Sequence, residues 1–125
     1  MQTLLEDRTC TKSNILFYFT GRPSIHIRPT HVNIVEGQSH TITCSISSIS
    51  DITDITWIKT TAVGYEIVNV VGVDGKFSVG TLSDPSLTIH NIVKSDEGTY
   101  VCRAANCCGT TSSEYSVLTF KGQFL

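Results

Sequence analysis

The chain contains the stretch Asp96-Glu97-Gly98-Thr99-Tyr100-Val101-Cys102, and this stretch decides the fold. From Thr99 onward, polar and apolar residues alternate, as they do in a strand with one buried face. The alternation continues to Ala104, so that Tyr100, Cys102 and Ala104 share the inward face of a predicted strand over residues 99–104. The cysteine of this stretch therefore points into a core.

Two further strands carry matching inward residues. Residues 41–46 alternate in the same way and place Cys44 inward between two isoleucines. Residues 55–59 likewise place Trp57 inward. Cys44 lies 58 positions before Cys102, and Trp57 follows Cys44 by 13 positions. These strands bring two cysteines and a large aromatic side chain to the same core.

Short β-rich runs separated by turn residues continue through the chain from Ile25 onward. The other predicted strands cover residues 66–71 (an edge strand), 76–79, 86–90 and 114–121. No segment has helical periodicity, and the spacing of the runs predicts an all-β sandwich or barrel. We expect one domain over residues 24–121, with residues 1–23 as a linker or tail and residues 122–125 as a C-terminal tail.

Charge and composition exclude several classes of partner. The net charge is −2 and Lys and Arg occur singly, so a nucleic-acid partner is not expected. The chain contains no run near the roughly 20 apolar residues of a membrane span, and its early apolar run at 15–19 is too short for a secretion signal. We expect the chain to be part of a longer protein whose signal and anchor lie outside it.

Three segments resemble the immunoglobulin superfamily, and in particular its intermediate (I-set) class. Residues 96–102 resemble the Asp-x-Gly-x-Tyr-x-Cys signature of immunoglobulin domains, and residues 102–109 resemble the Cys-x-Ala-x-Asn-x-x-Gly segment of I-set members. Residues 32–44 resemble the family's segment in which a valine, a Glu-Gly turn and a cysteine lead into the second strand. The resemblance implies an all-β, two-sheet Greek-key sandwich. A variable-type domain is the second choice, because the 45 positions from Trp57 to Cys102 leave little room for its extra strands.

The resemblance also implies roles for individual residues. It implies a disulfide between Cys44 and Cys102 that joins the two sheets, with Trp57 packed against it. Tyr100 takes the position of the family's tyrosine corner, where the hydroxyl bonds back to the chain. Lys76 takes the position of a basic residue that pairs with the signature aspartate, here Asp96.

The sequence shows no constellation that predicts catalysis, a cofactor or a metal site. The four histidines scatter over the predicted strands, and zinc sites need three or four converging ligands: His26, His31, His40 and His90. We expect His40 and His90 to lie on facing strands with both side chains outward. Asp51 and Asp54 supply too few oxygens for calcium. The chain is therefore not expected to be an enzyme.

Three cysteines lie outside the predicted core pair. Cys107 and Cys108 fall in the hairpin between the last two strands, and Cys10 precedes the domain. Five cysteines in a chain this small favour an oxidising compartment, and because the total is odd at least one thiol stays free or pairs with another molecule. The sequence leaves two alternatives: exposed thiols in the turn, or an extra disulfide from Cys10 to Cys107 or Cys108. Either alternative allows a disulfide-linked dimer.

The fold alone does not assign a function. The resemblance to the immunoglobulin superfamily implies a protein-recognition module. We expect a domain of a cell-adhesion molecule, receptor ectodomain or matrix protein, outside the cell or at its surface, that binds a protein weakly, whether homophilic or heterophilic. The alternatives are an intracellular muscle-type structural module in a cytoplasmic filament and a secreted immune-recognition protein. The predicted contact surfaces are the edge strand over residues 66–71 and the loops over 47–54 and 106–111, which share one pole of the fold.

We predict that the oxidised protein contains the Cys44–Cys102 disulfide. Closing a loop of this size stabilises the fold by about 4 kcal/mol in the chain-entropy model. Peptide mapping without reductant should recover the two cysteines in one linked peptide pair. Recovery of Cys44 linked to Cys107 or Cys108 instead would contradict the fold assignment.

Overall fold

Ten short strands and one 3₁₀ turn make up the regular structure of the described residues. The structure, a computed structural model, describes residues 21–68 and 75–121. In chain order the elements are β1 (Ser24–Arg28), β2 (His31–Ile34), β3 (His40–Ser47), β4 (Asp54–Thr61), β5 (Gly64–Ile67), β6 (Phe77–Val79), β7 (Leu87–Ile89), η1 (Lys94–Asp96), β8 (Gly98–Asn106), β9 (Gly109–Ser112) and β10 (Ser116–Phe120). In these ranges no helix has the length and hydropathy that crossing a membrane would require.

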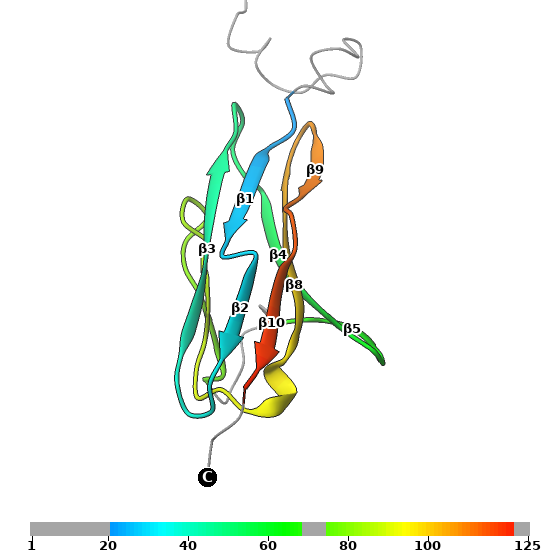
Figure 1. Cartoon of the computed structure of the whole chain (residues 1–125). Helices are drawn as coiled ribbons and strands as arrows, with labels where there is room; N and C mark the ends of the chain where they lie inside the picture. The colour runs from blue at the N-terminus through cyan, green and yellow to red at the C-terminus, as the bar shows by residue number, and fades with distance from the viewer. Residues whose placement is uncertain (1–20, 69–74, 122–125) are drawn as a thin grey trace, which may run out of the picture.

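The strands form two sheets that face each other (Figure 1). One sheet has the order β1-β3-β7-β6, and the other has the order β2-β10-β8-β4-β5, with β9 paired to β8. Neighbouring strands are antiparallel except β2 and β10, which are parallel. The prediction of an all-β, two-sheet sandwich is confirmed.

The two N-terminal strands, β1 and β2, follow each other in the chain but belong to different sheets. A cis peptide bond at Arg28-Pro29 separates β1 from β2. β1 pairs with β3 in one sheet, whereas β2 pairs with β10 in the other. The buried hydroxyl of Ser116 donates a hydrogen bond to the carbonyl oxygen of Pro29 at 2.5 Å. This crossing was not predicted, because an alternating pattern does not say which sheet a strand joins.

The predicted strands over 41–46, 55–59, 86–90 and 99–104 overlap with β3, β4, β7 and β8, with bounds that differ by one or two residues. Elsewhere the bounds also differ. β5 begins at Gly64, two residues before the predicted edge strand, and residues 69–71 of that prediction lie outside the described residues. β10 begins at Ser116 rather than at Glu114, and β9 was not predicted.

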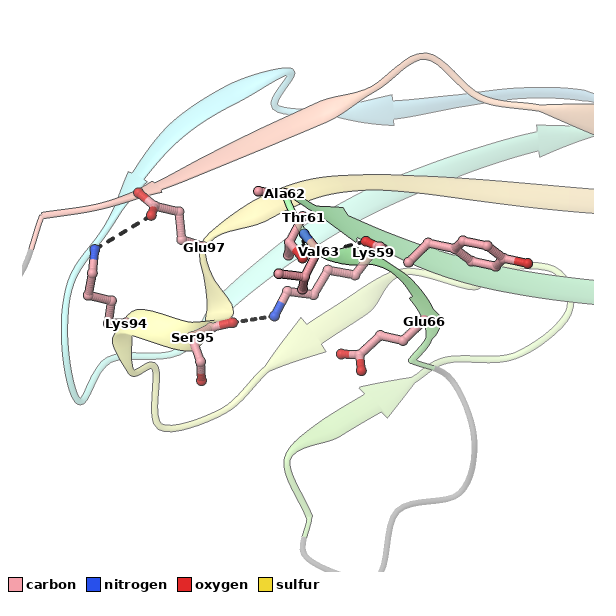
Figure 2. A pocket seen from close by; sticks show the side chains of 10 residues that line it. Lys59, Thr61, Ala62, Val63, Glu66, Lys94, Ser95 and Glu97 are labelled. Atoms are coloured by element: carbon pink, nitrogen blue, oxygen red, sulfur yellow. Dashed lines mark hydrogen bonds and ion pairs between the residues drawn. The ribbon is translucent and has the colours of Figure 1, made fainter.

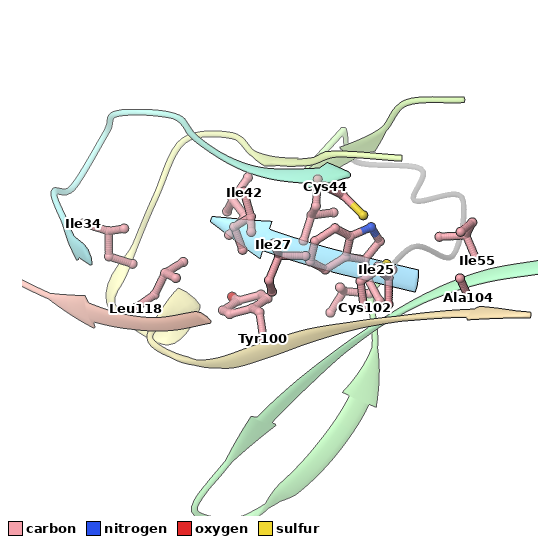
Figure 3. Close-up of a cluster of buried hydrophobic side chains, with 14 of the residues drawn as sticks. Ile25, Ile27, Ile34, Ile42, Cys44, Ile55, Tyr100, Cys102, Ala104 and Leu118 are labelled. Atoms are coloured by element: carbon pink, nitrogen blue, oxygen red, sulfur yellow. The ribbon is translucent and has the colours of Figure 1, made fainter. Parts of the chain in front are cut away.

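The core lies between the sheets and is built from inward positions of both (Figure 3). Figure 3 shows Cys44 on one sheet and Cys102 on the other, with Ile27 and Tyr100 farther along the same layer. The largest fully buried apolar side chains are those of Trp57, Tyr100, Ile27, Ile42, Leu87, Ile89, Ile92 and Leu118. Because all of these residues except Ile92 come from strands, many of them distant in the sequence, the core is assembled by sheet pairing rather than by local contacts.

The polar atoms of the Trp57 and Tyr100 side chains both form hydrogen bonds inside the core. The indole Nε1 of Trp57 donates to the carbonyl oxygen of Pro85 at 2.8 Å. The hydroxyl of Tyr100 donates to the carbonyl oxygen of Asp96 at 2.7 Å, and burial raises the pKa of this phenol. Buried aromatic side chains therefore contribute apolar area without leaving an unpaired polar group, which would be costly.

Two further positions explain local sequence choices. A Cβ on Gly98 would lie 3.1 Å from the carbonyl oxygen of Thr60 on the neighbouring strand, so glycine permits close pairing there. His40, expected to face outward, has the same phase on β3 as the buried Ile42. That expectation is wrong: its Nε2 is buried and has no hydrogen-bond partner among residues 21–68 and 75–121, and burial lowers the pKa of the ring.

We predict that Trp57→Ala lowers the free energy of unfolding by about 3–5 kcal/mol, because it empties the centre of the core and leaves the Pro85 carbonyl without its donor. Urea unfolding measures the change. The matched control is Tyr115→Ala, an exposed aromatic side chain whose loss should change stability by less than about 0.5 kcal/mol. Equal effects of the two substitutions would show that Trp57 is not central to the core.

Candidate functional site

The two inward cysteines meet across the core. Cys102 is paired in register with Trp57 on β4, and Cys44 faces it from β3. Both residues are thiols in the structure. The neighbouring thiol lowers the pKa of Cys44, whereas the neighbouring thiol and burial raise the pKa of Cys102. The two side chains face each other across the core, and the disulfide itself stays a prediction.

A second polar cluster lies at the end of the sandwich that carries η1. Lys76 Nζ lies 2.5 Å from Asp96 Oδ2 and also donates to the carbonyl oxygen of Asn91 at 3.0 Å. The same carboxylate oxygen accepts the backbone N–H of Val93 at 2.8 Å, while the Asp96 carbonyl accepts the Tyr100 hydroxyl. Asp96 is buried, and these hydrogen-bond donors compensate for the water that its carboxylate has lost. These contacts connect the loop after β7 to the start of β8.

The β4–β5 hairpin projects from the body of the sandwich (Figure 1). Its tip and outer strand carry Val63, Tyr65 and Ile67, with exposed fractions of 97%, 75% and 50%. Single exposed apolar residues are ordinary on protein surfaces, but three within five positions form a patch. The edge strand predicted from the sequence begins only at Glu66, and Val63 and Tyr65 were not identified, because exposure depends on the direction in which the hairpin leaves the sheet.

A lysine fastens this hairpin to η1. Lys59 is only 7% exposed, and its Nζ donates to the carbonyl oxygen of Ser95 and lies 6.0 Å from the centre of the Tyr100 ring. Figure 2 shows Lys59 reaching from β4 to the η1 segment, with Val63 and Glu66 on the hairpin. An open groove of 530 Å³ lies between the hairpin and η1. The hairpin is thus held at its base while its tip stays in solvent.

The outer face of the larger sheet continues this patch, and we call it the recognition face. Ile58 is paired in register with Ile67 on one side and Val101 on the other. In the adjoining row, Thr60 is paired with Tyr65 and Thr99, and Thr99 with Val117. These positions alternate with the buried Trp57 and Cys102 and therefore point away from the core. The recognition face comprises Ile58, Thr60, Tyr65, Ile67, Thr99, Val101 and Val117.

The two loops that the sequence placed at one pole do lie together. The side-chain Nδ2 of Asn106 donates to Ser48 Oγ and to the carbonyl oxygen of Gly21, both at 2.8 Å. Asn106 Oδ1 accepts the backbone N–H of Cys108 at 2.7 Å. This buried amide joins the loop after β3, the entry to β1 and the β8–β9 hairpin at one end of the sandwich (Figure 1). No local sequence pattern indicates this role of Asn106.

The adjacent cysteines of this hairpin have different environments. Cys108 is fully buried and disulfide-bonded. Cys107 is exposed, and its Sγ contacts Ser50 Oγ at 3.6 Å. Cys10, which the sequence offered as the partner of either residue, lies outside the described residues. The pairing of Cys10 with Cys108 and a covalent dimer through Cys107 therefore stay predictions.

The histidines and loop aspartates do not converge. His26 pairs with Glu114 at 3.3 Å, His90 contacts Ser78 Oγ at 2.7 Å, and His31 lies exposed on β2. Asp54 accepts the Thr56 hydroxyl, and Asp51 is exposed. Within residues 21–68 and 75–121, no three His, Cys, Asp or Glu side chains gather as metal ligands.

Glu114 is a structural residue that sequence reasoning missed. It follows β9, yet its Oε1 accepts the backbone N–H of Ile27 on β1 at 2.9 Å, and its Oε2 contacts His26 Nδ1. The Ile27 N–H, with a further contribution from His26, holds the pKa of this carboxyl below its ordinary value of 4.5. Glu114 thus ties β1 to the opposite sheet at its exposed edge.

Comparisons with known proteins agree with this architecture. A family model described as an immunoglobulin domain matches residues 22–106. Basigin of Mus musculus is 38% identical over 102 residues, covering 78% of this chain and 26% of basigin. Hemicentin-1 of Homo sapiens is 31% identical over 96 residues, covering 77% of this chain and 2% of hemicentin-1. Cell adhesion molecule 1 of Mus musculus is 28% identical over 103 residues, covering 79% of this chain and 20% of that protein.

We predict that Glu114 makes stability depend on pH in the acid range. Because its folded-state pKa is depressed, its contribution is present above the unfolded value and is lost as the pH falls through the lower folded value. At pH 6 the free energy of unfolding should be higher for wild type than for Glu114→Gln. This difference in unfolding free energy should disappear as the pH falls well below 4.5.

Urea unfolding at several pH values measures this difference. The matched variant is His26→Gln, which should keep most of the acid-range dependence, since the Ile27 N–H is the larger cause of the shift. A difference between wild type and Glu114→Gln that is the same at every pH would contradict the prediction.

Proposed function

The chain belongs to the immunoglobulin domain family, and on this premise we propose that it is a non-catalytic, I-set protein-recognition domain of a longer extracellular or cell-surface protein. We take residues 24–121 as the domain. The proposal concerns one module, because the chain spans about a quarter or less of the relatives named above.

The strand order supports the I-set class. Constant-type domains have four strands in one sheet and three in the other, and variable-type domains add two strands to the three-stranded sheet. Here the sheet β2-β10-β8-β4-β5 has one strand, β5, beyond β4 among the described residues. The separate strand β2, which pairs with β10, agrees with the proposed I-set class.

The single observation that carries the recognition role is the exposed apolar patch of the β4–β5 hairpin and the adjoining recognition face. Val63, Tyr65 and Ile67 are exposed beside the outward Ile58 and Val101. Burying such a patch against another protein is favourable at about 25 cal/mol per Å² of apolar surface. Contiguous apolar patches on a soluble domain mark contact sites.

The relatives support a location outside the cell and a binding role. One of them is named for cell adhesion. A single domain with a patch of this size should bind weakly, and clustering of several copies on a surface raises the effective concentration. Affinity in the proposed role therefore comes from multiple copies rather than from one contact.

We predict that beads carrying many copies of the chain capture a protein from a panel of cell-surface ectodomains, and that Val101→Glu abolishes capture. The charge would lie in the middle of the recognition face, where the partner would have to desolvate it. Captured protein is measured by fluorescence of the labelled ectodomain.

The matched control is Ser45→Glu, an exposed position on β3 of the other sheet, which should leave capture unchanged. Capture lost with Ser45→Glu and kept with Val101→Glu would move the contact to the other sheet. A panel from which the clustered wild type captures no protein would contradict the recognition role.

A further inference from the structure

We propose that β5 pairs antiparallel with β5 of a second copy of this chain, so that the two larger sheets join into one continuous sheet. The inference rests on the proposed recognition role and names a partner for it. In the described part of the chain β5 pairs only with β4, and all four of its residues are exposed. A strand in this position presents a row of backbone donors and acceptors to a second strand.

The register with β4 decides which backbone groups point outward. Val68 N–H donates to the carbonyl oxygen of Trp57 at 3.0 Å, so this position is a hydrogen-bonded pair. Hydrogen-bonded and non-hydrogen-bonded pairs alternate along an antiparallel ladder. Glu66, opposite Lys59, therefore directs its N–H and C=O toward β4, whereas Tyr65 and Ile67 direct theirs away from it.

This alternation restricts how two copies can pair. An antiparallel pair exchanges hydrogen bonds only where outward-directed residues lie opposite each other. The register that uses both outward-directed residues places Tyr65 of each copy opposite Ile67 of the other, with the two Glu66 residues between them. Both Tyr65–Ile67 pairs then exchange N–H···O bonds about a two-fold axis, so the strand is complementary to itself.

The side chains fit the same register. Tyr65 and Ile67 both belong to the recognition face, so each cross-copy pair joins an aromatic to a β-branched side chain, a favourable combination. The recognition faces of the two copies become continuous. The strand also lacks the prolines and lysines that commonly prevent edge pairing.

One feature opposes the pairing. The two Glu66 side chains lie opposite each other on the inner side, and like charges at such positions are destabilising. The adjacent Lys59 ammonium is committed to Ser95 and the Tyr100 ring. A four-residue strand also buries a small area, so the structure favours a weak, reversible dimer, as in other small interfaces.

The test is sedimentation velocity of the 125-residue chain up to about 1 mM, in a Cys107→Ser background that prevents covalent dimers through this residue. Wild type should show a reversible monomer–dimer equilibrium. Tyr65→Glu and Ile67→Lys should each raise the dissociation constant about tenfold, whereas Glu66→Gln should lower it about threefold by removing the repulsion. Tyr115→Glu, an exposed tyrosine outside β5, is the matched control and should have no effect.

A mixture tests the register itself. Tyr65→Glu chains mixed with Ile67→Lys chains should associate more tightly than either variant alone. In the mixed dimer, one of the two cross-copy pairs joins the introduced glutamate to the introduced lysine, and the other remains the native Tyr65–Ile67 pair. Absence of this recovery, or insensitivity of the dimer to the β5 substitutions, would overturn the proposal. A wild-type chain that stays monomeric at about 1 mM would also overturn it, while capture of an ectodomain by beads would leave the recognition role standing.

Discussion

The contact between the two sheets at Cys44, Trp57 and Cys102 is the constraint on which the rest of the structure depends. Trp57 and Cys102 lie side by side on β4 and β8, and Cys44 faces them from β3. Their burial fixes the phase of all three strands, since a slip of one residue would turn every inward side chain to solvent. The other core positions of both sheets follow from this phase.

The same phase determines what the domain offers to a partner. With Trp57 and Cys102 inward, Ile58 and Val101 must point outward, and the outer face of the larger sheet becomes partly apolar. The pairing of β4 with β5 then brings Tyr65 and Ile67 into that face. A partly apolar outer face of this kind is a direct consequence of core packing combined with strand alternation.

Polar side chains hold the parts that the core does not reach. Lys59 fastens the β4–β5 hairpin to η1, Asp96 collects donors at the same end, and Asn106 joins three segments at the opposite pole. Glu114 holds β1 at the edge of the sandwich. Each of these groups has several partners, so burial of Lys59, Asp96 and Asn106 carries little desolvation penalty.

The sequence by itself determined the all-β class and the inward faces of β3, β4 and β8, because alternation with a period of two is a local property of the chain. The choice of a two-sheet sandwich over a barrel came from the resemblance of residues 96–109 to immunoglobulin domains. The sequence also indicated the pole shared by two loops. Only the tertiary structure decided that β1 and β2 join different sheets, that His40 turns inward, and that Lys59, Asn106 and Glu114 bridge separate segments. These features depend on contacts between residues far apart in the sequence, and no local pattern encodes which distant backbone group a polar side chain will reach.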